Sequence, residues 1–151
     1  MVTLKPGDAA PLFSANDQHG NLVSLEAFKG KKVVLYFYPK DDTPGCTAEA
    51  CNLRDNHAEL INQGYIVIGV SPDALKSHQK FTDKYELPFS LLPDIEKTII
   101  QAYGAWGPKK FLGKSYEGVL RSTFVIDENG ILEKVFTQVD TKNHTEQILK
   151  A

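Results

Sequence analysis

The chain is poor in several features that mark specialised proteins. Its 151 residues include two cysteines, and no apolar run approaches the roughly 18 residues of a membrane-spanning helix. The first residues lack the apolar core of a secretory signal. A net charge of −2 provides no excess of basic residues for nucleic acid or an anionic membrane. These absences predict one domain over residues 1–151, located in the cytoplasm, with neither nucleic acid nor membrane as a partner.

The scarcity of cysteine also limits what the two thiols can do. A chain of this length buries roughly 68–70% of the surface that it exposes when unfolded, so it needs no disulfide or metal to fold. Because cytosolic thiols are kept reduced, Cys46 and Cys51 are either a transient catalytic pair or two small buried side chains. Their spacing differs from a CxxC redox motif and, with no histidine nearby, from a four-ligand zinc site. We therefore predict no metal at these cysteines.

Apolar runs and turn residues predict an alternation of strands and helices. The runs at 32–38 and 65–71 are rich in β-branched residues without alternation, which is typical of strands buried on both faces. Strands that alternate with helices predict an α/β fold with a mixed central sheet, parallel in its middle, and helices on both faces. The expected elements are a hairpin within 12–24, helical turns at 24–30, strands at 32–38, 65–71, 89–92, 119–127 and 131–138, and helices at 47–62, 71–85, 94–103 and from Thr141 or Asn143 to Lys150.

Helical periodicity assigns faces to several side chains. Leu53, Leu60 and Ile61 are expected on one apolar face of the helix at 47–62. His78 is expected on the polar side of the next helix, between Ser77 and Gln79.

Residues 104–120 are rich in glycine and show no clear period. A segment of this length without secondary structure is typical of a lid or a binding loop. Trp106 and Tyr116 within it either cover a pocket or pack on the core. Lys109-Lys110 is expected on the solvated surface.

Cys46 lies where a chain can make a reactive thiolate. Thr43 is a good N-cap residue and Pro44 suits the first helical position, which puts Cys46 in the first turn of a helix. Unpaired N–H groups and the positive end of the helix dipole favour an anion there, and the thiolate is the nucleophilic form of cysteine. Gly45 leaves space for a substrate to approach the backbone. The Thr43 hydroxyl alternatively turns toward the sulfur or a bound oxygen.

The chain has two arginines that could act as a cation at this site. Arg54 is expected on the exposed side of its helix. Arg121 opens an apolar strand, and a permanent charge beside a core strand needs an anion to bind. Two interpretations stay open for Arg121: a structural ion pair with a carboxylate such as Glu49, or a cation that faces Cys46. Glu49 lies three residues after Cys46 on the same helix face, so it could also orient an arginine toward the sulfur.

Helix geometry separates Cys46 from Cys51. Five residues along a helix rise by about 7.5 Å and turn by roughly 140°, which places the two Cα atoms roughly 8–9 Å apart. A disulfide needs Cα atoms within about 7 Å of each other. The two cysteines can therefore join only if the first helical turns unwind.

A signature motif surrounds Cys46. Residues 39–46 read Pro-Lys-Asp-Asp-Thr-Pro-Gly-Cys and match the P-x-x-x-[TS]-x-x-C signature of peroxiredoxins. The extension Thr-Ala-Glu-Ala-Cys at 47–51 resembles the PrxQ, or bacterioferritin comigratory protein (BCP), subfamily of thiol-dependent peroxidases. The segments 103–107 and 118–127 are similar to later blocks of that subfamily. The resemblance spans nearly the whole chain, with these blocks in the same order and spacing.

This resemblance implies a thioredoxin-like fold with an added N-terminal β-hairpin. It also implies the reduction of hydrogen peroxide and organic hydroperoxides without a cofactor. Cys46 would be the peroxidatic cysteine and Cys51 the resolving one, joined in a disulfide that thioredoxin or a similar dithiol reduces. We expect a monomer, with at most weak dimerisation.

The resemblance also assigns roles around the sulfur. Thr43, Arg121 and the backbone N–H of Cys46 would hold the two peroxide oxygens, and Pro39 would shield the sulfur from solvent. Fixed donors of this kind lower the barrier because negative charge grows on the leaving oxygen.

Two other classes of function remain open at this point. One is a thiol–disulfide oxidoreductase without peroxide specificity, although the set of Thr43, Arg121 and Pro39 speaks against it. The other is a non-enzymatic redox sensor or holdase in which unwinding of the helix is the output.

Overall fold

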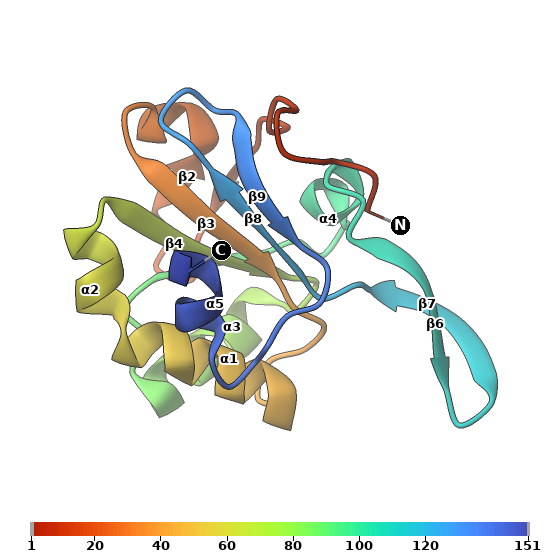
Figure 1. Ribbon diagram of the computed structural model, residues 1–151. Coiled ribbons are helices and arrows are strands. Elements are labelled where there is room, and N and C mark those ends of the chain that lie inside the picture. Colours follow the sequence, from red (N-terminus) through yellow and green to blue (C-terminus); the bar gives the residue numbers. More distant parts are fainter. Residues whose placement is uncertain (1, 151) are drawn as a thin grey trace.

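A five-stranded mixed sheet forms the centre of the computed structural model, which describes residues 2–150 (Figure 1). Its strand order is β5 (Ser90–Pro93), β4 (Tyr65–Ser71), β3 (Lys32–Phe37), β8 (Ser122–Ile126) and β9 (Leu132–Phe136). β4 is parallel to both β3 and β5, whereas β8 is antiparallel to both β3 and β9. The predicted mixed sheet with a parallel middle is confirmed.

β3 contributes side chains to both faces of this sheet. Val33, Leu35 and Phe37 belong to one apolar cluster, and Val34 and Tyr36 belong to the other. Each of these five residues is at most 1% exposed. A strand buried on both faces has no polar side, which explains its continuous apolar sequence.

Helices cover both faces of the sheet, as predicted (Figure 1). The face that holds Tyr36 is covered by α1 (Pro44–Asp55), α2 (His57–Asn62), α3 (Leu75–Tyr85) and α5 (His144–Lys150). The opposite face is covered by α4 (Thr98–Ala102) and the 3-10 turn η1 (Leu25–Phe28). Within residues 2–150, every helix is too short or too polar to span a bilayer.

Two small hairpins lie outside the central sheet. β1 (Ser14–Asn16) and β2 (Leu22–Ser24) form the predicted N-terminal hairpin. β6 (Trp106–Phe111) and β7 (Lys114–Val119) form a second hairpin, which extends away from the body of the protein (Figure 1).

The prediction of an irregular loop at 104–120 was therefore wrong. Gly107 and Pro108 lie inside β6, and both residue types are rare in strands. The turn uses Leu112 and Gly113, with φ of 51° and 77°. A turn with two positive φ angles usually carries Asn-Gly or Asp-Gly, so its sequence signal was absent.

The predicted helix at 47–62 is divided into α1 and α2 at Asn56. The side-chain Nδ2 of Asn56 donates to Asn52 O at 2.8 Å, and its φ and ψ of −109° and 13° leave the helical region. An asparagine side chain that bonds to the backbone competes with the helical pattern.

Two other helices begin later than predicted. Lys97 is left-handed, with φ of 61°, so α4 begins only at Thr98 instead of at 94. α3 begins at Leu75 with Ala74 as its N-cap, whereas residues 71–73 were predicted to cap it. The Asp73 carboxylate instead accepts bonds from the Ser71 hydroxyl and the Asp41 N–H.

Two predicted side-chain positions were also wrong. Leu53 and Leu60 are fully buried, but Ile61 is 52% exposed, since it follows Leu60 directly and points about 100° away from it. His78 is fully buried rather than on a polar face. It precedes Phe81 by three residues on α3, and this spacing was the available signal for a buried stripe.

We expect Leu53→Ala to lower the free energy of unfolding by about 2–5 kcal/mol, because it removes a buried side chain and leaves a cavity. Ile61→Ala is the matched control and should change stability by no more than about 0.5–1 kcal/mol. Denaturant unfolding of both variants measures the difference, and equal losses would contradict the assigned burial.

Candidate active site

Cys46 and Arg121 meet where the first turn of α1 faces the start of β8. The Cys46 residue is 1% exposed, and Arg121 Nη2 donates to its sulfur at 3.2 Å. Arg121 Nη1 donates to Glu49 Oε1 at 2.7 Å. One guanidinium therefore contacts both the sulfur and a carboxylate, so the two interpretations left open for Arg121 hold together.

Gly45 makes room for this arrangement. A Cβ atom at position 45 would lie 3.2 Å from Arg121 Nη2, which is closer than an ordinary van der Waals contact. The sequence suggested space for a substrate at this glycine, whereas the structure uses that space for the guanidinium.

Thr43 occupies the N-cap position of α1 without capping it through its side chain. Its hydroxyl donates to Lys40 O at 2.9 Å, so the predicted side-chain cap is not formed. Thr47 N–H donates to Thr43 O at 2.8 Å. This bond begins the helical pattern, and the N–H of Cys46 lies in the first turn, where N–H groups have no partner within the helix. Its availability to a bound peroxide stays a prediction.

The two cysteines lie on one unbroken helix and both are free thiols. Cys46 is buried and Cys51 is half-buried. Pro39 is half-buried in the loop after β3. Its shielding of the sulfur stays a prediction.

Burial dominates the electrostatics of Glu49. It raises the pKa of this carboxyl to about 7, although Arg121 acts in the opposite direction. Burial lowers the pKa of Arg121. Its interactions with Cys46 and Glu49 together raise that pKa by more, so the net pKa lies above the ordinary value. Near neutral pH, Arg121 is therefore charged, whereas the Glu49 carboxyl is close to its pKa.

His144 and Thr123 lie beside Glu49, and neither residue was predicted at this site from the sequence. His144 Nε2 lies 3.6 Å from Glu49 Oε2 and 2.7 Å from Thr123 Oγ1. The three residues are distant in the chain and meet because α5 packs on α1 beside β8. No local pattern could have indicated this contact.

The predicted surface position of Lys109 was wrong. Lys109 is half-buried and its Nζ donates to Val119 O at 2.9 Å, whereas Lys110 is exposed. Burial lowers the pKa of Lys109, and the charge of Arg121 lowers it further. Lys109 thus brings a second positive charge toward the site. Trp106 packs against the core, in agreement with one of the two alternatives for this residue.

α3 holds the loop that precedes α1. Asp41 Oδ2 lies 2.7 Å from His78 Nδ1. The Asp42 carboxylate accepts bonds from Lys84 Nζ at 2.8 Å and from the Tyr85 hydroxyl at 2.7 Å. The backbone just before Thr43 is therefore fixed to a neighbouring helix.

α5 holds α1 just after Cys51. Asn52 Nδ2 donates to Lys142 O at 2.9 Å, and Asn52 Oδ1 accepts the N–H of Thr145 at 2.8 Å. Cys51 is thus next to a fixed point.

Asp41, Asp73 and His78 place potential metal-ligand atoms within 4.8 Å of one another. Hydrogen bonds account for this cluster, because Asp41 also accepts the Tyr38 hydroxyl at 2.6 Å and its N–H donates to Asp73 at 2.7 Å. The absence of a metal stays a prediction.

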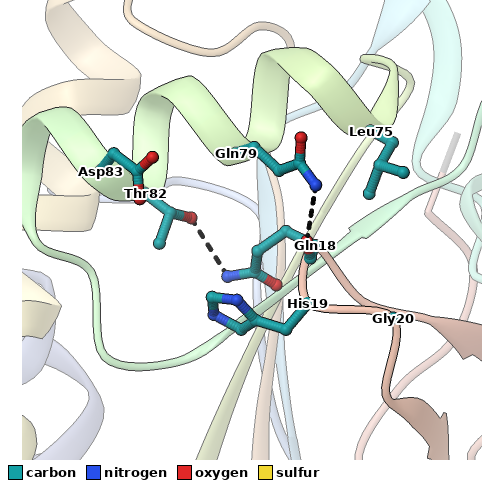
Figure 2. A pocket seen from close by; sticks show the side chains of 7 residues that line it. All are labelled: Gln18, His19, Gly20, Leu75, Gln79, Thr82 and Asp83. Carbon is teal, nitrogen blue, oxygen red and sulfur yellow. Dashed lines mark hydrogen bonds between the residues drawn. The ribbon is translucent and has the colours of Figure 1, made fainter.

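A surface hollow lies between α3 and the turn of the N-terminal hairpin (Figure 2), and Cys46 is not among the residues that line it. Gln18 Nε2 donates to Thr82 Oγ1 at 3.1 Å, and Gln79 Nε2 donates to Gln18 O at 3.2 Å. These bonds join the hairpin to the helix, which gives Gln18 a structural role. His19 at the rim is exposed.

We expect Glu49→Gln to gain stability relative to the wild type as the pH rises from about 4.5 to about 7. Burial raises the Glu49 pKa to about 7, so in this window the folded protein binds more protons than the unfolded chain, and its stability falls with pH. Glutamine has no such proton. Denaturant unfolding at several pH values measures the difference, and a difference that stays constant with pH would contradict the assignment.

Comparisons with known proteins agree with this site and fold. Residues 6–135 match the AhpC/TSA family. The chain is 46% identical over 149 residues to peroxiredoxin Bcp of Escherichia coli K12, covering 99% of this chain and 96% of that protein. It is 45% identical to a putative peroxiredoxin bcp of Coxiella burnetii over 98% of both chains. A structure of Xanthomonas campestris peroxiredoxin Q superposes with a TM-score of 0.86 at 32% identity, covering 94% of each chain, which confirms the thioredoxin-like fold. The chain belongs to the AhpC/TSA family and, within it, to the Bcp peroxiredoxins, which are thiol-dependent peroxidases.

Proposed function

We propose that the chain reduces hydrogen peroxide and organic hydroperoxides at Cys46. The observation that carries this proposal is the bond from Arg121 Nη2 to the Cys46 sulfur at 3.2 Å, in a site where Glu49 holds the same guanidinium. A structure of the X. campestris bacterioferritin comigratory protein, with a TM-score of 0.86 and 31% identity to this chain, is described in terms of alkyl peroxide reduction activity. That relative supports organic hydroperoxides as substrates.

The first step forms a sulfenic acid. The thiolate sulfur of Cys46 attacks one peroxide oxygen, the O–O bond breaks, and the other oxygen leaves as an alkoxide or hydroxide that takes a proton from solvent. Arg121, the N–H of Cys46 and the hydroxyl of Thr43 stabilise the charge on that oxygen. Thr43 must turn away from Lys40 O to take part, while Pro39 shields the sulfur.

The second step forms a disulfide within the chain. The thiol of Cys51 attacks the sulfenic sulfur, and water leaves. Five residues of helix separate the two sulfur-bearing residues by a rise of about 7.5 Å, so the first turns of α1 must unwind before the sulfur atoms meet. The half-buried position of Cys51 makes it accessible once they do.

The third step returns both thiols. Thioredoxin or a similar dithiol attacks the disulfide, becomes oxidised itself and leaves two reduced cysteines. We place this cycle in the cytoplasm, where such reductants are available, and in a monomer with at most weak dimerisation.

We expect Cys46→Ser to abolish peroxide consumption in an assay with a thioredoxin system. Cys51→Ser should allow one oxidation of Cys46 per chain and then stop, because no internal disulfide forms. Non-reducing mass analysis after peroxide treatment should show a 46–51 bond in the wild type alone. Steady-state turnover by Cys46→Ser would overturn the proposal, while oxidation by disulfides but not by peroxide would indicate a general thiol–disulfide oxidoreductase.

We expect Arg121→Lys to slow the oxidation of Cys46 by about 10²-fold or more, the usual cost of losing one donor from an oxyanion site. Lysine keeps the charge but cannot contact the sulfur and Glu49 with two nitrogens of one rigid group. Arg54→Lys is the matched control, since Arg54 bonds to Tyr85 O and Asp55. Equal rates for both variants would contradict the role of Arg121.

A further inference from the structure

Asp41 is a buried carboxylate in the loop between β3 and α1. Its side chain is 3% exposed. The hydroxyl of Tyr38 donates to its Oδ1 at 2.6 Å, and the hydroxyl of Ser77 donates to its Oδ2 at 2.8 Å. His78 Nδ1 lies 2.7 Å from Oδ2 and donates to it, because a carboxylate oxygen accepts. The side chain of Asp41 therefore connects the end of β3 to the first turn of α3.

The backbone of Asp41 is held as well. Its N–H donates to Asp73 Oδ2 at 2.7 Å, and the hydroxyl of Ser71 donates to the same oxygen at 2.8 Å. Ser71 is the last residue of β4, so Asp41 is fixed to the central sheet as well as to α3.

Asp41 lies inside the turn that leads to Thr43. Thr43 Oγ1 donates to Lys40 O at 2.9 Å and closes this turn over residues 41 and 42. Asp42 has φ of 58°, a left-handed conformation that a residue other than glycine keeps only where its surroundings determine it. Because Thr43 follows these two residues directly, their conformation decides where its hydroxyl lies.

The two side-chain donors of the Cys46 site thus have separate supports. Glu49 on α1 holds Arg121 through a bond of 2.7 Å. Asp41 holds the turn before Thr43 from α3 and β4. A reaction that needs donors at both oxygens of a peroxide depends on how exactly these two supports are placed.

We propose that Asp41 is a positioning residue for the Cys46 site, which fixes the Thr43 hydroxyl relative to the Arg121 guanidinium. It acts on the peroxide only through Thr43. This inference rests on the proposed function of Cys46, Thr43 and Arg121. A merely structural role would stabilise the loop, and its loss would cost the same with or without the Thr43 hydroxyl.

The test is a double-mutant cycle on the rate constant for Cys46 oxidation by hydrogen peroxide. All variants carry Cys51→Ser, so that the first oxidation alone is observed. Asp41→Asn keeps the size of the side chain but turns one acceptor into an NH₂ group that faces donors. Thr43→Val removes the hydroxyl. Asp83→Asn, at an exposed position on α3, is the matched control.

We expect Asp41→Asn to slow this oxidation by about tenfold or more relative to the control, since a small displacement of a group that binds the substrate is costly. In the Thr43→Val background, Asp41→Asn should slow it by no more than about twofold, because the hydroxyl that Asp41 positions is already absent. Equal losses in both backgrounds, or no loss in either, would overturn the proposal.

A second pair of variants leaves the carboxylate unchanged. Tyr38→Phe removes the donor to Asp41 Oδ1 and keeps the ring, so it should slow the oxidation by about threefold or more while the Thr43 hydroxyl is present. Tyr36→Phe is the matched control, since Tyr36 is also buried and its hydroxyl has no hydrogen-bond partner within residues 2–150. Equal rates for these two variants would contradict the role of Asp41.

Alkylation of Cys46 by iodoacetamide separates two kinds of failure. This reaction uses the sulfur but not the Thr43 hydroxyl, so Asp41→Asn should not slow it. An equally large slowing of alkylation would place the effect on the sulfur itself and overturn the proposal. If the Cys51→Ser reference is alkylated but not oxidised by peroxide, the proposed function fails and this inference with it. A reference that is oxidised at the same rate as Asp41→Asn refutes the inference on Asp41 alone.

Discussion

The double contact of Arg121 with the Cys46 sulfur and with Glu49 is the constraint on which the site depends. A guanidinium that is mostly buried needs anionic partners, because loss of one leaves a charge without compensation. Both partners come from α1, one turn apart, and the arginine comes from the chain entering β8. Position 45 must therefore lack a side chain. The contact thus joins the first turns of α1 to the start of β8 through one side chain.

The parts of the fold that sequence could predict are those set by burial. β3 and β4 were found because strands covered on both faces must be apolar throughout. The failures share another cause. Asn56, Lys97 and Leu112 each adopt a backbone conformation that ends or replaces the expected element. Propensity gives little information at such positions.

The candidate site divides in the same way. The residues within one helix turn of Cys46 follow from local spacing and from the signature motif, and the contact between Arg121 and Glu49 was among the alternatives stated. His144 and Lys109 were not found, because each reaches the site from an element whose packing is determined by the whole topology. A buried histidine also has no distinctive sequence pattern, as His78 shows on α3.

The segment 43–51 is held at both ends, by α3 through Asp42 and by α5 through Asn52. In the proposed cycle, only the chain between these two anchors unwinds. Cys51 adjoins one anchor and stays near its place, so Cys46 is the residue that travels, and it leaves the arginine as it does so. Arg121 is then held by Glu49 alone until a reductant releases the sulfur. In this cycle, oxidation of the two sulfur atoms would unwind only the segment 43–51, while the central sheet keeps its shape.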